Sequence, residues 1–392
     1  MLKLGEAITR KRKLILVIAV LLLIPSFFGM IMTRINYDVL DYLPDDIETM
    51  KGQEILLDEF GKGGFSMVMV EGMEKKDVAV LKAKIEKVDH VDSVIWYDSI
   101  MDVSVPYEAI PESVYEEFNS GDTTLMAVFF DSSVSSDESM NAVSEIRKLG
   151  NEQCFVSGMS AFVTDLKELA EKEEPIYVGI AVILACIVLA VFMDSWLIPV
   201  LFIVGIGMAI MYNLGSNAFM GEVSYITKAL SAVLQLGVTM DYSIFLWHSY
   251  EEQRGIPGRD KEEAMSHAIA NTITSVAGSS ITTIAGFLAL CFMTFTLGKD
   301  LGIVMAKGVL FGVVGCVTIL PSLILTFEKA IEKTRHRSVM PKFNKLSSLV
   351  TKKPAVFAVI FIVLLIPSLI GYTHTDVYYN LDKSVPQTLP FA

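Results

Sequence analysis

Gly237-Val238-Thr239-Met240-Asp241-Tyr242 lies inside an apolar stretch that runs from Val223 to Trp247. Such a stretch is long enough to cross the hydrocarbon core of a bilayer, which takes roughly 20 apolar residues. An ionisable carboxyl group at that depth is costly unless it is paired, hydrated or protonated, so it marks a functional site by default. The Asp241 carboxyl is therefore the first candidate functional group of this chain.

The composition is that of a membrane protein. Of the 392 residues, 52% are hydrophobic, and the mean hydropathy is +0.50. Seven apolar stretches are long enough to span a bilayer: residues 14–32, 176–193, 197–214, 223–247, 273–295, 301–327 and 355–372. The first is too long, and too poor in small residues at its far end, for a cleaved signal peptide, so we expect a retained anchor.

A polar block, residues 36–174, separates the first stretch from the second. It carries 31 acidic and 11 basic side chains, a net charge of −20, whereas the whole chain carries −13 and the remaining residues together +7. We interpret the block as one soluble domain whose acidity serves mainly solubility and would repel nucleic acid. The block has a single cysteine, Cys154, and the chain has no metal-ligand spacing, so we expect no metal site and no cofactor.

Basic residues predict the orientation, because they are enriched in cytoplasmic loops. Clusters lie at residues 10–13, before the first stretch, at 254–261, after the fourth, and at 329–353, after the sixth. Counting spans places all three on the same side. We therefore expect a plasma (inner) membrane protein with a cytoplasmic N-terminus and an extracytoplasmic acidic domain.

The acidic block alternates strand and helix patterns. Runs rich in β-branched and aromatic residues predict four strands, at Phe65–Gly72, Val91–Tyr97, Thr124–Asp131 and Cys154–Gly158. Apolar periodicity predicts helices at Lys75–Val88 and Ser136–Leu149, a shorter helix after Pro111, and a helix at Ala161–Glu174 that leads into the second span. This order is the split βαβ arrangement of an α+β ferredoxin-like (βαββαβ) domain. The block contains no catalytic constellation, so we do not expect an enzyme.

An internal repeat divides the chain. Leu22-Leu23-Ile24-Pro25-Ser26 recurs as Leu364-Leu365-Ile366-Pro367-Ser368, an offset of 342 residues. The same offset maps Gly29 onto Gly371, Asp38 onto Asn380 and Pro44 onto Pro386. The first and seventh spans thus begin equivalent halves, as in transporters built from parallel repeats. We expect a truncated or fragmentary sequence, with one complete half and the start of another.

Three local features resemble the MMPL branch of the resistance–nodulation–division (RND) superfamily. The first is Gly237-x-x-x-Asp241-Tyr242 in the fourth span. The second is the link Glu262-Glu263-Ala264-Met265-Ser266-His267-Ala268, which leads into a Ser/Thr-rich fifth span with Gly286-Phe287. The third is Leu320-Pro321-Ser322-Leu323, which ends the sixth span. Together with the order of spans and the repeat, the resemblance covers nearly the whole chain.

The resemblance implies an RND-type half with a porter-like outer domain, which exports lipids or other hydrophobic molecules at the expense of the proton gradient. In this family the Asp-Tyr pair of the fourth span works with a similar pair in the tenth span. The equivalent position here falls near residue 583, beyond the sequence. The implied partners are the lipid bilayer, a hydrophobic or lipid-like substrate, and the missing second half or a partner chain, with a homo-oligomer as a further option.

For the site, we predict a proton relay at Asp241 and Tyr242, with Gly237 allowing another helix to pack closely. Lys307, Ser279 and Thr283 are possible relay neighbours, and Ser275, Thr282, His248 and Lys228 are weaker candidates. Each has a structural alternative: Asp241 can be held by a buried partner, and Tyr242 can be an ordinary core aromatic. The lysines can snorkel to the interface, and the hydroxyl groups can serve helix contacts.

Three functions fit these patterns. The leading one is a proton-driven exporter of lipids or other hydrophobic or amphiphilic molecules. The second is a non-transporting lipid-sensing receptor or regulator, for which Asp241→Asn changes nothing. The third is a protein-export auxiliary of the same superfamily, whose outer domain binds unfolded chains.

These expectations divide the chain into six parts. They are the N-terminus and first span (1–35), the porter-like domain (36–174), spans two to six (175–327), a basic cytoplasmic linker (328–354), the seventh span (355–373) and the start of a second outer domain (374–392).

Overall fold

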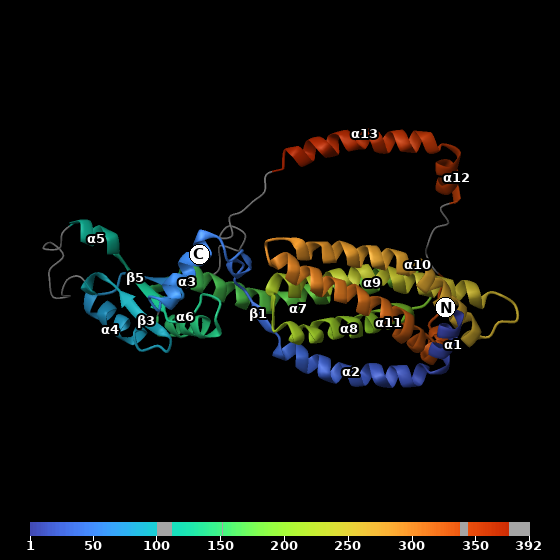
Figure 1. The fold of residues 1–392 in the computed structure, drawn as a ribbon, viewed down its shortest axis with the longest axis horizontal. Coiled ribbons are helices and arrows are strands. Elements are labelled where there is room, and N and C mark those ends of the chain that lie inside the picture. Colours follow the sequence, from blue (N-terminus) through green and yellow to red (C-terminus); the bar gives the residue numbers. More distant parts are fainter. Residues whose placement is uncertain (100–111, 151, 338–343, 376–392) are drawn as a thin grey trace.

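The computed structural model describes residues 1–99, 112–150, 152–337 and 344–375. It separates an α/β domain from a bundle of long helices, and the two lie end to end (Figure 1). The expected repeat positions Asn380 and Pro386, nearly all of segment 374–392 and the middle of the basic linker lie outside the described residues.

The α/β domain is built on one antiparallel sheet. Its strands are β2 (Phe65–Glu71), β3 (Val91–Ile95), β5 (Thr123–Phe130) and β6 (Cys154–Ser157), in the order β3-β5-β2-β6, with β4 (Asn119–Ser120) paired to β5. The register sets Val68 opposite both Met126 and Val156. All four predicted strands are therefore present. The second ends two residues early, because Tyr97–Ser99 forms a 3-10 turn, η2.

Helices cover this sheet through an apolar core. They are α4 (Lys75–Ile85) and α6 (Asp137–Leu149), with α3 (Glu48–Asp58) and α5 (Glu112–Phe118) nearby. Strand β2 alternates buried and exposed residues, so Val68 and Val70 point inward. They join a core that includes Val78 of α4 and Val143 of α6. Ser136 caps α6, accepting a hydrogen bond from Ser139 N.

The described part of the chain contains the seven long apolar helices that the sequence predicted. They are α2 (Arg12–Met32), α7 (Met159–Phe192), α8 (Leu197–Ser216), α9 (Tyr225–Arg254), α10 (Lys261–Ala289), α11 (Leu297–Lys333) and α13 (Pro354–Thr373). Helix α11 is the most buried of these. Helix α7 has 34 residues and continues without a break from the α/β domain into the bundle, as the segment Ala161–Glu174 predicted. Short helices α1 (Leu2–Arg10) and α12 (Asn344–Lys352) precede α2 and α13.

Glycines allow helices to touch backbone to backbone at α2 and α8. A Cβ atom built on Gly29 would lie 2.2 Å from the carbonyl oxygen of Gly215, and one on Gly215 would lie 2.3 Å from that of Ser26. No side chain larger than hydrogen fits such gaps. Gly237 differs from expectation, because no described residue lies within 4 Å of a Cβ atom built there. The close helix contact predicted at Gly237 is therefore absent from the described part of the chain.

Helix α13 stands apart from the bundle (Figure 1), and none of its residues is buried. Like α2, it has an interior proline, Pro367 in α13 and Pro25 in α2. The pattern repeated at an offset of 342 thus forms an apolar helix with an interior proline twice, while only the first copy is packed against the bundle.

The domain and the bundle are joined by a small junction. Strand β1 (Arg34–Asn36), after α2, pairs in parallel with β7 (Glu222–Ser224), before α9. The next turn, η1 (Leu40–Tyr42), accepts two hydrogen bonds on the Tyr42 carbonyl from Thr296, one from its N–H at 2.9 Å and one from its hydroxyl at 3.0 Å. These bonds tie the start of the domain to the start of α11.

Asp38 is buried in this junction, with 3% of its surface exposed. Its Oδ1 accepts a hydrogen bond of 2.8 Å from Leu40 N, while its Oδ2 has no partner among the described residues. Burial raises the pKa of Asp38 from 3.8 to about 6, and the nearby Asp41 carboxylate adds to the rise. The folded protein therefore favours the neutral form of Asp38.

This shift predicts a pH dependence of stability. Because the folded pKa of Asp38 is raised, its contribution is complete below about pH 4 and is lost as the pH rises through about 6. We expect wild type to lose on the order of 2 kcal/mol of unfolding free energy across this window, and Asp38→Asn to lose much less. Chemical unfolding of the full chain in detergent at pH 4 and pH 7 measures both. Equal pH dependence in the two proteins would contradict the prediction.

Candidate functional site

Helix α9 positions the Asp241 carboxyl and has two unlike faces. The helix begins after Ser224, whose side chain accepts a hydrogen bond from Ile226 N, and it ends at Arg254. Asp241, Phe245, His248 and Glu252 recur at intervals of three and four, so they share one face. All four side chains are exposed and line one cavity, and we call this the open face of α9.

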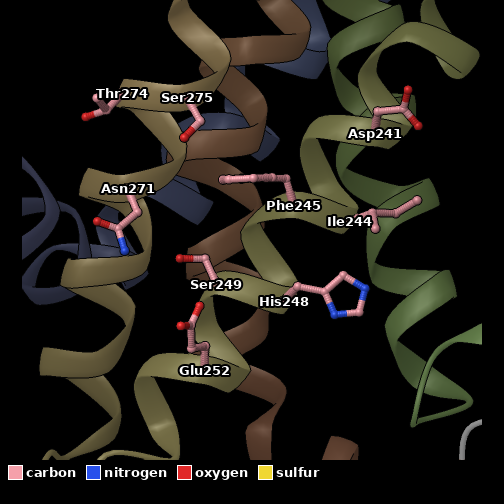
Figure 2. Close-up of a pocket in the computed structure, with 9 residues that line it drawn as sticks. All are labelled: Asp241, Ile244, Phe245, His248, Ser249, Glu252, Asn271, Thr274 and Ser275. Atoms are coloured by element: carbon pink, nitrogen blue, oxygen red, sulfur yellow. The ribbon is translucent and has the colours of Figure 1, made fainter. Parts of the chain in front are cut away.

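A cavity of about 590 Å³ lies between this open face and α10. Its lining combines apolar, hydroxyl, amide and ionisable side chains: Asp241, Ile244, Phe245, His248, Ser249 and Glu252 from α9, and Asn271, Thr274 and Ser275 from α10. In Figure 2 the Phe245 ring lies between Asp241 and the three α10 side chains. Two carboxyl groups and an imidazole therefore line the cavity along one helix face, spread over about three helical turns.

Asp241 itself has no intramolecular partner in the described part of the chain. No hydrogen bond or ion pair reaches its carboxylate from those residues, and the side chain is exposed on the open face. This face is where a bilayer or another polypeptide would meet the bundle. A carboxyl group that faces either of these is stabilised only by protonation, water or a partner.

Tyr242 points into a different environment from its neighbour. It is 8% exposed and belongs to the apolar core of the bundle, together with Leu246 and Trp247. Successive residues of a helix point about 100° apart, which is what separates Asp241 from Tyr242. The predicted pair thus straddles the boundary between the open face and the interior.

Lys307 and Lys228 both bind groups other than Asp241. Lys307 Nζ donates to Ser216 Oγ at 2.9 Å and to Asn217 Oδ1 at 2.7 Å. Lys228 forms an ion pair of 3.0 Å with Glu174 of α7. Neither lysine contacts Asp241, so their predicted roles as its partners find no support in these contacts.

Only some of the predicted hydroxyl-bearing residues of α10 lie at the cavity. Ser275 lines the cavity, as does His248, which the sequence also suggested. Ser279 and Thr283 instead donate to carbonyl groups of their own helix, those of Val276 and Ser279. They lie one and two turns beyond the cavity and do not reach Asp241.

Sequence reasoning missed Glu252, Asn271 and Thr274 as lining residues. The signal for Glu252 was present, because it lies eleven residues after Asp241 and four after His248, on the same helix face. Asn271 lies three residues before Thr274 and four before Ser275, which is helical spacing. Which faces of α9 and α10 are turned toward each other was not readable from this spacing.

The end of the bundle far from the α/β domain is closed by ion pairs. Arg335 binds Asp194 at 2.8 Å and also contacts Glu251, while Trp247 Nε1 donates to Asp194 Oδ1 at 3.0 Å. Arg254 and Lys261 both reach Glu328, at 3.0 and 2.8 Å. Arg12 binds Glu262 at 2.7 Å. These contacts bring the three basic clusters of the sequence to one end of the bundle.

Seven long apolar helices and a carboxyl group within one of them define a multi-pass membrane protein. The chain matches the model of the MMPL family over residues 41–366. It therefore belongs to the MMPL family, whose resemblance to this sequence rested on the fourth, fifth and sixth spans.

Three relatives illustrate the match. A putative membrane protein of Methanocaldococcus jannaschii is 23% identical over 378 residues, which cover 86% of this chain and 94% of that protein. The siderophore exporter MmpL5 of Mycobacterium tuberculosis is 24% identical over 60% of this chain and 25% of its own length. The apo-petrobactin exporter of Bacillus anthracis is 21% identical over 79% of this chain and 42% of its own. The chain thus spans less than half the length of the two named exporters it matches.

Among solved structures, SecDF is similar with a TM-score of 0.43 and 14% sequence identity. That similarity covers 83% of this chain and 39% of the SecDF chain.

Proposed function

We propose that this chain is one half of a proton-driven exporter of hydrophobic or amphiphilic molecules, and that its helix bundle couples proton movement to export. The observation that carries the proposal is the Asp241 carboxyl, within α9 and beside a cavity that also holds His248 and Glu252. One relative is named a siderophore exporter and another an apo-petrobactin exporter, which supports an export function. Protonation of Asp241 would remove a charge from a face that meets lipid or protein, and would thereby favour a different packing of that face.

The proposal includes an orientation and a partner. The three basic clusters lie at one end of the bundle, so we place that end in the cytoplasm and the α/β domain outside. The strand order β3-β5-β2-β6 supports a ferredoxin-like outer domain that receives substrate. The open face of α9, with Gly237 uncovered, offers a surface for a second half or a second copy of the chain. No resident cofactor is part of this scheme.

Reconstituted vesicles test the energy source. We expect vesicles with a proton gradient to move at least one member of a panel of fluorescent lipid analogues and siderophores. Because the gradient would drive the movement, a protonophore should lower the rate at least tenfold. Protein-free vesicles, made from the same lipids with the same detergent treatment, serve as the control. Movement of a substrate at an equal rate with and without the gradient would contradict the proposal.

A further inference from the structure

A second polar face of α9 lies inside the bundle. Its residues recur every four positions and are each at most 2% exposed: Thr227, Ser231, Gln235, Thr239 and Ser243. Spacing by four places them in one row along the helix. This row is turned toward α8 and α11, away from the open face that carries Asp241. At Gly312 of α11, a built Cβ atom would lie 1.8 Å from Thr239 Cγ2, so the two helices touch along the row.

Three hydroxyl groups of this row, those of Ser231, Thr239 and Ser243, are satisfied by their own helix. Ser231 donates to the Lys228 carbonyl at 2.9 Å, Thr239 to that of Gln235 at 2.5 Å, and Ser243 to that of Thr239 at 3.3 Å. These side chains need no further ligand. The amide of Gln235 has no such local bond and reaches across to α8 instead.

The cross-helix partner of Gln235 is Asn213. Asn213 Nδ2 donates to Gln235 Oε1 at 3.0 Å, and the two residues are 0% and 1% exposed. Asn213 Oδ1 and Gln235 Nε2 are buried and have no partner among the described residues. Rotating both amides would reverse the bond but would again leave one acceptor and one donor unused. The pair therefore calls for a ligand that both donates and accepts.

Water is the ligand that fits. It can donate to Asn213 Oδ1 and accept from Gln235 Nε2, and leaving these buried polar groups unpaired would be unfavourable. The backbone makes room here, since a Cβ atom on Gly308 would lie 2.8 Å from Asn213 Nδ2 and 3.0 Å from Gln235 Oε1. The Lys307 ammonium, one residue away on α11, disfavours a metal cation at the same place.

Polar groups lead from this pair toward the α/β domain. Ser216 accepts from Lys307 Nζ at 2.9 Å and donates to the Asn213 carbonyl at 2.9 Å. Asp300 lies two helical turns before Lys307 on α11, where its Oδ2 accepts from Ser224 N at 2.8 Å. The line from Asp300 to Asn213 thus starts at the junction between the domain and the bundle.

In the opposite direction the row leads to the predicted relay. Thr239 lies one turn after Gln235, and Tyr242 lies seven residues after Gln235 on the same face. Tyr242 is buried on this interior side, next in sequence to Asp241. The amide pair therefore lies between the polar groups at the junction and the interior end of the Asp-Tyr pair.

We propose that Asn213 and Gln235 bind water inside the α8–α9–α11 bundle, and that this water carries protons from the domain side, past Asp300 and Lys307, to the Tyr242 side of the relay. The water site stands on the amide geometry alone. Its role as a proton route rests on the proposed function. The route lies within one half of the transporter, separate from the open face on which Asp241 is exposed.

Thiol labelling tests the water site. In a chain whose four native cysteines are replaced by alanine, Asn213→Cys is treated from the domain side with a small, water-soluble, membrane-impermeant thiol reagent. Ala209→Cys, one turn away on α8 and 1% exposed in wild type, is the matched control. Water at the amide pair favours the reactive thiolate, so Asn213→Cys should react at least tenfold faster. Equal rates in the two variants would overturn the water site. Gln235→Cys gives a second measurement if Asn213→Cys is not monodisperse.

Transport assays test the proton route separately from the water site. Gln235→Met keeps the size of the side chain but removes both amide groups, and Leu236→Met, next to it on α9, is the apolar control. We expect Gln235→Met to lower proton-driven transport at least tenfold and Leu236→Met to change it less than twofold. Normal transport by Gln235→Met would overturn the proton route, even where Asn213→Cys is labelled. Normal transport by Asp241→Asn would instead overturn the proposed function and leave the labelling result to decide the water site.

Discussion

Replacing Asp241 by asparagine is expected to abolish proton-driven transport while the protein still inserts and folds. Asparagine keeps the size of the side chain but cannot release a proton. No described residue bonds the carboxylate, so the exchange breaks no intramolecular contact. We expect the transport rate to fall at least tenfold in reconstituted vesicles, with the same elution profile in detergent as wild type. Asp241→Glu, which keeps a titratable group on the open face, should retain part of the activity.

Two comparisons make this result specific. Glu6→Gln also converts a carboxyl to an amide, at an exposed position of α1, and should transport like wild type. Wild-type transport by Asp241→Asn would refute the relay and favour a lipid-sensing role for the chain. Loss of monodisperse protein in Asp241→Asn would show instead that the carboxylate is a structural group.

Replacing Asp165 by alanine is expected to destabilise the α/β domain strongly. Asp165 lies near the start of α7 and is 1% exposed, and its carboxylate makes a two-point ion pair with Arg147 of α6, with Nη2 to Oδ2 at 3.0 Å. Removing the carboxylate leaves the arginine charge largely buried, which costs about 3–5 kcal/mol. The pair also fixes the domain to α7, the helix that continues into the bundle.

A double-mutant cycle measures this effect. Chemical unfolding followed by the fluorescence of the fully buried Trp96 reports on the domain. Arg147→Met combined with Asp165→Leu should recover most of the lost stability, because two apolar side chains leave no unpaired charge. Glu145→Ala breaks an exposed pair with Lys148 and should cost less than about 1 kcal/mol. A cost for Asp165→Ala as small as that for Glu145→Ala would show that the buried pair contributes little.

Much of the secondary structure could be predicted because it follows from local patterns of apolar and polar residues. The alternation of Val68 and Val70 with exposed neighbours predicted strand β2, and the apolar spacing from Ser136 to Leu149 predicted α6. The sheet order was not readable, since pairing of Val68 with both Met126 and Val156 joins strands far apart in the chain.

The candidate site divides in the same way. Its central residue, Asp241, was predicted from the hydropathy of one segment, because a carboxyl group within an apolar stretch is conspicuous whatever its tertiary neighbours. Its neighbours were harder, since Lys307 and Ser279 had the right chemistry at suitable depth yet contact other groups. Asn213 and Gln235 were not predicted, because two uncharged amides on separate helices can be recognised as a site only from the hydrogen bond between them.

The sequence by itself determined that the chain has seven apolar segments long enough to cross a membrane, that an acidic α/β domain follows the first, and that Asp241 lies within the fourth. Hydropathy and periodicity are properties of single segments, so no partner is needed to read them. Only the tertiary structure decided that Asp241 faces an open cavity, that Tyr242 and Gln235 face the interior, and that Lys307 binds Ser216 and Asn217. The physical reason is that α9 carries polar residues on two faces, so its own sequence does not specify which face turns toward the other helices. Packing against α8, α10 and α11 sets the rotation of α9 and thereby chooses which polar groups meet.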